Sequence, residues 1–131
     1  MSLYLTVFSG NGEVDGWVLG HYSDFDYFRE CVGELILAGS APLLMEHSDC
    51  DGEWEAHDLP LLRNEIESIA GSCKVLPPRT IIGAFEHTRR YRSNARSLYD
   101  CFHNVDGTNL FQALIDLCDL GISLNAPILF Q

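Results

Sequence analysis

The stretch Glu46-His47-Ser48-Asp49-Cys50-Asp51-Gly52-Glu53-Trp54-Glu55 places five acidic side chains, a histidine, a cysteine and a tryptophan within ten residues. The apolar run 42–45 in front of it predicts a buried strand. Behind it, Asp58 and Pro60 predict the first turn of a helix, because Asp is a preferred N-cap and Pro is tolerated where a helix begins. We therefore expect a strand-to-helix loop that serves as a metal site, a catalytic site or a surface that meets another molecule.

Hydrophobic patterning on both sides of this loop predicts further strands. Residues 3–8 are apolar on both faces, which is typical of a central strand. Residues 13–20 predict a second, shorter strand, in which Asp15-Gly16 forms a turn. Patterns that favour strands occur at 3–8, 13–20, 42–45, 80–82, 98–102 and 127–131.

Apolar residues at helical spacing predict three helices, over 23–39, 58–71 and 108–125. The first opens on a capping box formed by Ser23 and Asp26. Together with the strands they predict the α+β class, with a single mixed sheet of four or five strands covered on one face by about three helices. The length of 131 residues predicts one domain that spans residues 1–131.

The net charge of −11 is unevenly distributed along the chain. Residues 1–73 hold 14 Asp and Glu against only Arg29 and Arg63, a net −12, whereas residues 74–131 hold six Lys and Arg against five Asp and Glu, a net +1. An acidic half disfavours nucleic acid as a partner, because phosphates attract Lys and Arg. It favours a cation or a basic protein partner, in addition to solubility.

The cysteine content and the hydropathy pattern predict the cellular compartment of the protein. The five cysteines are odd in number and lack Cys-x-x-Cys spacing, which favours a reducing compartment over a disulfide framework. No apolar run approaches 18 residues, and no basic segment followed by an apolar one opens the chain. We therefore expect a cytoplasmic protein that does not bind membranes.

The first candidate for the loop is a calcium site. Asp49-x-Asp51-Gly52 resembles the opening of an EF-hand loop, which needs Gly at its sixth position and Glu at its twelfth. Trp54 and Pro60 stand at those positions, so the pattern disfavours an EF-hand.

Zinc binding and catalysis are the second and third candidates. His47, Cys50 and His57 are possible zinc ligands that Cys73 could join, although closely spaced ligands occur on one side only. The same loop offers His47, Asp49 and Asp51 as general base and electrostatic stabilisers and Cys50 as nucleophile, without any of the usual catalytic motifs. A small metal-dependent hydrolase or metal-binding module that uses the loop between the two histidines stays the alternative. We predict no cofactor.

Motifs distributed over most of the chain resemble those of a known family. They are Tyr4 in the first strand, His47-Ser48-Asp49-Cys50-Asp51-Gly52-Glu53-Trp54, Leu76-Pro77-Pro78, Ser97-Leu98-Tyr99-Asp100-Cys101-Phe102, Val105-Asp106-Gly107 and Pro127-Ile128-Leu129-Phe130-Gln131. In this order they make the chain similar to the immunity protein 70 family of bacterial polymorphic toxin systems. The resemblance implies a cytoplasmic antidote, made beside a secreted toxin, that binds this toxin and blocks it without a catalytic residue.

The acidic loop is then predicted to contact the cognate toxin domain. A basic nuclease is one candidate for this toxin, because an acidic inhibitor can steer toward it and cover its phosphate-binding residues. Trp is a frequent anchor in interfaces, but it can equally cap the core from its edge. The predicted partner-binding residues are Asp15, Asp49, Asp51, Glu53, Trp54, Glu55 and Asp106. In a purely architectural alternative, Asp49 and Asp51 cap backbone N–H groups and orient Trp54 into the core.

Overall fold

The computed structural model describes residues 2–10, 12–37, 39–48, 51–78, 95–103 and 107–131. Its centre is one antiparallel sheet with the strand order β2-β1-β4-β3. The strands are β1 (Ser2–Ser9), β2 (Gly12–His21), β3 (Glu53–Trp54) and β4 (Ile128–Phe130). The α-helices are α1 (Tyr22–Gly33), α2 (Pro42–Met45), α3 (Leu59–Lys74) and α5 (Leu110–Leu124). This arrangement confirms the predicted α+β class; within the described residues every strand pairing is antiparallel, whereas a mixed sheet was expected.

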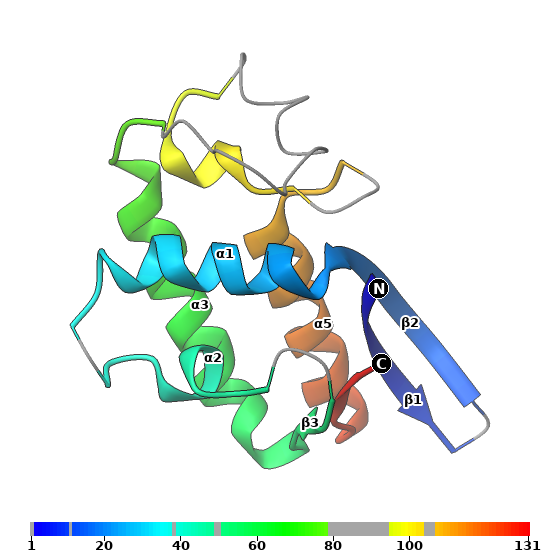
Figure 1. Cartoon of the computed structure of the whole chain (residues 1–131). Coiled ribbons are helices and arrows are strands. Elements are labelled where there is room, and N and C mark those ends of the chain that lie inside the picture. The colour runs from blue at the N-terminus through cyan, green and yellow to red at the C-terminus, as the bar shows by residue number, and fades with distance from the viewer. Residues whose placement is uncertain (1, 11, 38, 49–50, 79–94, 104–106) are drawn as a thin grey trace.

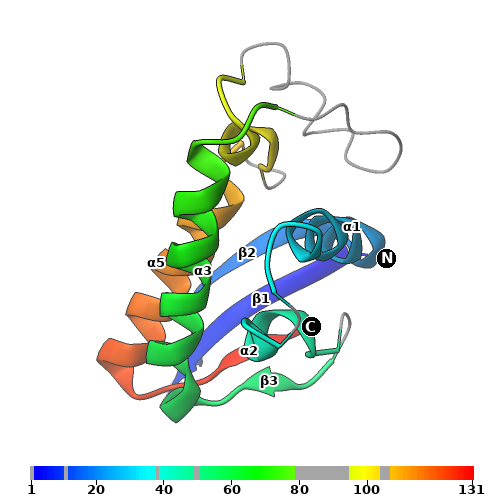
Figure 2. The same ribbon diagram turned by 90° about the vertical axis from the view of Figure 1, so that its left-hand side faces the viewer.

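The helices lie on one side of the β1–β2 hairpin, with α1 crossing near one end and α3 and α5 side by side (Figure 1 and Figure 2). The face of β1 that points toward them carries Leu3, Leu5 and Val7, all without exposed surface. The helices fill the core with aliphatic side chains, and a cluster of aromatic rings packs among them. These rings are Phe25 and Phe28 from α1, Phe111 from α5 and Phe102 from the segment before α5.

The hairpin is the largest part of the sheet. β1 pairs with β2 on one side and with β4 on the other, so the prediction of a central strand is confirmed. The prediction of a turn at Asp15-Gly16 is wrong, because Asp15 pairs with Val7 and Gly16 with Thr6 inside a continuous strand. The register of the β1–β2 pairing shifts between Val7 and Phe8, where the partners change from Asp15 to Glu13. The chain reverses beyond the Ser9–Gly12 pair, at the end of the hairpin, instead of at Asp15-Gly16.

The predicted strand at 42–45 is also wrong, because these residues form helix α2. Pro42 suits the first turn of a helix. The carboxylate of Glu65, on α3, accepts the backbone N–H of Leu44 at 3.1 Å and that of Leu43 at 3.4 Å. A residue more than 20 positions away thus supplies the N-terminal cap, and four apolar residues alone do not distinguish a helix from a strand.

Four further expectations change in detail. The segment predicted as a strand at 98–102 is a 3₁₀ helix, Leu98–Cys101. The first helix ends at Gly33 rather than 39, and the second continues to Lys74 because Cys73 still points into the core. The last helix is capped by Asn109 rather than Thr108: Oδ1 of Asn109 accepts the N–H of Gln112 at 3.2 Å. The predicted strand at 80–82 lies outside the described residues.

Helices α3 and α5 pack against each other at an unusually close point. A Cβ on Gly121 of α5 would collide with the side chain of Leu59 and lie 2.8 Å from the carbonyl oxygen of Ala126. Gly121 therefore allows the start of α3 to approach the end of α5. Helix α5 then stops at Asn125, whose φ of 51° is left-handed, and the chain enters β4 as predicted.

Candidate functional site

The acidic stretch is part of the sheet rather than a loop outside it. Glu53 pairs with Leu129 and Trp54 with Ile128, which makes β3 the edge strand beside β4. The carbonyl oxygen of Gly52 also accepts the N–H of Phe130 at 2.9 Å. Backbone hydrogen bonds to the C-terminal strand therefore hold the second half of the stretch in place.

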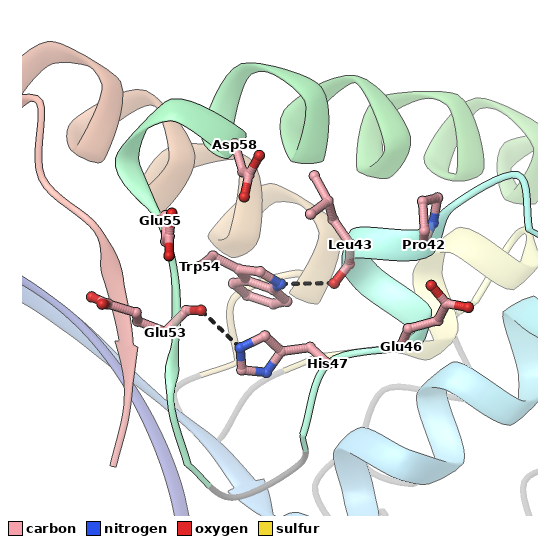
Figure 3. A pocket seen from close by; sticks show the side chains of 8 residues that line it. All are labelled: Pro42, Leu43, Glu46, His47, Glu53, Trp54, Glu55 and Asp58. Carbon is pink, nitrogen blue, oxygen red and sulfur yellow. Dashed lines mark hydrogen bonds between the residues drawn. The ribbon is translucent and has the colours of Figure 1, made fainter.

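The first half is held by His47, whose ring closes the loop. Its Nε2 lies 2.9 Å from the carbonyl oxygen of Glu53, and its Nδ1 lies 2.9 Å from that of Ser48 (Figure 3). The ring stacks on Phe130 with 4.1 Å between centroids. Because a carbonyl oxygen can only accept a hydrogen bond, a neutral imidazole satisfies one of the two contacts and an imidazolium satisfies both.

Trp54 is a core residue with only 2% of its surface exposed. Its indole N–H donates to the carbonyl oxygen of Leu43 at 2.7 Å, which links β3 to α2 (Figure 3). The ring makes edge contacts with Phe130 at 4.6 Å and with Phe25 at 6.4 Å. These contacts give Trp54 an architectural role, and only its edge is available to another molecule.

A pocket of about 300 Å³ opens between α2, β3 and the start of α3 (Figure 3). Trp54 contributes an apolar part of its wall. The lining residues are Pro42, Leu43, Glu46, His47, Glu53, Trp54, Glu55 and Asp58. Four of them are acidic and none is Lys or Arg, so the opening suits a positively charged group with an apolar stem.

Glu55, His57 and Asp58 form a cluster beside this pocket. Nδ1 of His57 lies 3.3 Å from Glu55 Oε2, and its Nε2 lies 3.5 Å from Asp58 Oδ1. Their potential ligand atoms lie within 4.8 Å of one another, a spacing that a metal ion can bridge. The predicted metal set was different: His47 turns both ring nitrogens to carbonyl oxygens, and Asp49 and Cys50 lie outside the described residues.

The cysteines described by the structure are buried thiols, at positions 31, 73, 101 and 118. Burial raises the pKa of Cys73 to about 11 and that of Cys118 to about 12. A thiol that stays protonated is a poor nucleophile and a poor metal ligand. These two cysteines therefore act as small apolar core residues.

The predicted contact residues occupy two opposite edges of the sheet. Asp51, Glu53 and Glu55 are exposed on and beside β3, whereas Asp15 is exposed on β2, where Oδ1 accepts the N–H of Gly16 at 2.8 Å. Three strand spacings separate these edges, or about 14 Å. Asp15 therefore does not line the pocket, and Asp106 lies outside the described residues.

Sequence reasoning missed Glu46 and Asp58 as pocket residues and Glu13 as an acidic neighbour of Asp15. Glu13 accepts a hydrogen bond from Tyr4, and this bond, more than burial, raises the pKa of the Tyr4 hydroxyl. No strand pattern marked Glu13, because it pairs with Phe8, four residues from Tyr4, and only the length of the two side chains brings them together. No local signal marked Asp58, which was interpreted only as a helix cap and in fact makes no side-chain capping bond.

Within the parts of the chain that the structure describes, no helix combines the length and the apolar character needed to cross a bilayer. No curated protein and no solved structure matches the chain. A family model does match, with the description Immunity protein 70, and it covers residues 7–130 of 131. The match includes β2, the acidic stretch, β4 and the α-helices of the described residues. The chain therefore belongs to the immunity protein 70 family.

Proposed function

We propose that this protein binds the cognate toxin domain of a bacterial polymorphic toxin system in the cytoplasm and blocks it by steric and electrostatic contact, without catalysis. The contact surface that we propose is the acidic stretch together with its pocket, extended by Asp15, Asp49 and Asp106. The observation that supports it most strongly is a pocket lined by four acidic residues and no Lys or Arg, in a chain of an immunity protein family.

The described cations leave this surface negative. Arg63 is paired with Glu67 and Asp119 on the helices. Arg29 is mostly buried; it reaches the acidic stretch from the inner side, where it donates to the carbonyl oxygen of His47 and pairs with Asp26. The exposed carboxylates at the pocket are therefore available to attract a positively charged partner.

A basic partner fits this field. Long-range attraction between an acidic inhibitor and a basic protein raises the association rate constant, to about 10⁸–10⁹ M⁻¹s⁻¹ at low salt in favourable cases. A nuclease that holds nucleic acid with Lys and Arg offers such a surface, and covering it would block its substrate. We therefore propose a basic nuclease as the toxin class.

The test is the affinity of the protein for the toxin domain encoded beside it, measured by titration calorimetry and stopped-flow. Charge reversal of Asp51, Glu53 and Glu55 to Lys should weaken binding more than about tenfold, mainly through slower association, with a weaker dependence on salt. The matched control reverses three exposed acids on the helices, which makes the same change of net charge. These are Glu30, Glu67 and Asp116. Equal effects of the two triple variants would show that only net charge matters and would refute the assignment of the surface.

The runner-up is a metal-binding module, and the Glu55-His57-Asp58 cluster is the observation that favours it. Elemental analysis of protein purified without a metal-affinity tag distinguishes the two. A near-stoichiometric metal that is lost in His57→Asn would support the runner-up. Unchanged toxin binding by the same variant would separate the metal from the contact surface.

A further inference from the structure

The side of the sheet turned away from the helices forms a continuous surface. Side chains alternate along a strand and residues directly opposite each other in a pair share a face, so this outer face can be derived from the register. It carries Tyr4, Thr6 and Phe8 from β1, Val18, Gly16 and Glu13 from β2, Leu129 from β4 and Glu53 from β3. The helices that the structure describes all lie on the opposite side (Figure 1).

The outer face has an apolar middle and acidic edges. Tyr4, Val18 and Leu129 are half-buried, and Phe8 is 36% exposed. Glu13 and Glu53 are exposed at the two edges, about 14 Å apart across three strand spacings. The four strands contain no Lys or Arg.

The middle of this face is low and flat. A Cβ on Gly16 would lie 2.7 Å from Cζ of Tyr4, so the Tyr4 ring occupies the space above the glycine. Glycine inside a strand often marks such a close approach. Opposite Gly16, Thr6 is completely buried, and its hydroxyl has no hydrogen-bond partner within the described part of the chain. A sheet face that carries partly exposed apolar side chains and a buried, unsatisfied hydroxyl is unusual if it meets only water.

We infer that this outer sheet face, from Glu13 to Glu53, is a second contact region for the toxin domain, continuous with the acidic stretch through Glu53. The inference rests on the proposed function and adds to it a partner surface that is basic at its rim and apolar at its centre. An apolar centre with a charged rim is the usual composition of a protein interface. A second copy of this chain fits poorly, because Glu13 and Glu53 would meet like charges across the interface.

Substitutions at Phe8 test this contact region and separate the effect of side-chain size from the effect of side-chain charge. Phe8→Lys and Phe8→Glu both replace the ring by a long polar side chain, and they differ mainly in sign. Against a basic partner surface, Phe8→Lys should bind the adjacent-gene toxin domain about tenfold more weakly than Phe8→Glu. The control pair is Val75→Lys and Val75→Glu, at an 84%-exposed position beyond the end of α3 that lies far from the hairpin (Figure 1). The two control variants should bind alike.

Each outcome decides the inference. Folding of every variant is verified by thermal melting, and the mass of the toxin-free protein is measured by light scattering. If both Phe8 variants bind like wild type while reversal of Asp51, Glu53 and Glu55 weakens binding, the outer face is not a contact and the proposed function stands. If neither set of changes affects binding, both assigned contact surfaces are wrong although the protein binds the toxin domain; if wild type itself does not bind the toxin domain, the proposed function fails. If the Phe8 variants change the mass of the toxin-free protein, the face joins two copies of this chain and the inference is overturned.

Discussion

Nε2 of His47 lies 2.9 Å from the carbonyl oxygen of Glu53, six residues further along the chain, and so closes the acidic stretch into a ring anchored on the sheet. The same ring stacks on Phe130 of β4. The Glu53 side chain, which we propose as part of the toxin contact, is therefore displayed on backbone that His47 and β4 hold in place. A fixed segment loses little conformational entropy when it binds.

Replacing His47 by Ala should lower the free energy of unfolding by about 1–2 kcal/mol, because it removes the closing hydrogen bonds and the stacking on Phe130. Urea denaturation followed by fluorescence measures the change. His57→Ala is the control, since the His57 side chain is 73% exposed and should contribute less than about 0.5 kcal/mol. Equal losses in both variants would show that His47 does not close the stretch.

Trp54→Phe should cost about 1–3 kcal/mol, because the carbonyl oxygen of Leu43 loses its indole donor at a nearly buried site. Trp17→Phe is the matched comparison: the indole N–H of Trp17 is buried without a hydrogen-bond partner among the described residues, so its loss should cost less. Chemical denaturation of the two variants measures the difference. A larger cost at Trp17 would contradict the role given to the Trp54 bond.

The difference in stability between wild type and Glu65→Gln should depend on pH. Burial raises the pKa of its carboxyl in the folded protein, even though the N–H groups of Leu44 and Leu43 oppose the shift. Because the folded pKa lies above the unfolded one, the stabilising effect of protonation is complete below the unfolded pKa and is lost as pH rises through the folded pKa. Relative to wild type, Glu65→Gln should therefore gain stability between about pH 4 and about pH 7.

Unfolding in urea at both pH values measures this gain, and Glu65→Ala serves as the control for the cap. The alanine variant leaves the N–H groups at the start of α2 without an acceptor, so it should lose about 1–3 kcal/mol at either pH. A difference between Gln and wild type that does not change with pH would contradict the raised pKa.

Two glycines in helices should respond in opposite directions to alanine. Gly121→Ala should destabilise the fold by about 1–3 kcal/mol, because the new Cβ meets Leu59 and the backbone of Ala126. Gly71→Ala should stabilise it by about 0.5–1 kcal/mol, since nothing lies within 4 Å of that Cβ in α3. Thermal melting of both variants measures the contrast. Stabilisation by Gly121→Ala would show that the contact of α3 and α5 is looser than described.

Local patterns predicted the elements whose own residues decide their structure. The β-branched and aromatic residues of 3–8, apolar on both faces, predicted β1 and its central place, and Asn125 predicted the end of α5 because it tolerates a left-handed backbone. The site was predicted less completely. The acidic stretch was identified as the important segment, but its description as a loop missed β3, whose partner strand β4 lies more than 70 residues away.

The sequence by itself determined the acidic character of the first half, the family and the alternation that gives β1 a core face and an outer face. Only the tertiary structure decided that 42–45 is a helix, that Trp54 points into the core and that Asp15 and Glu53 lie at opposite edges of one sheet. The physical reason is the same in each case. The deciding partners come from other parts of the chain, and a local pattern of apolar and charged residues does not specify them. They are Glu65 for α2, Leu43 and Phe130 for Trp54, and the strands β1 and β4 for the two acids.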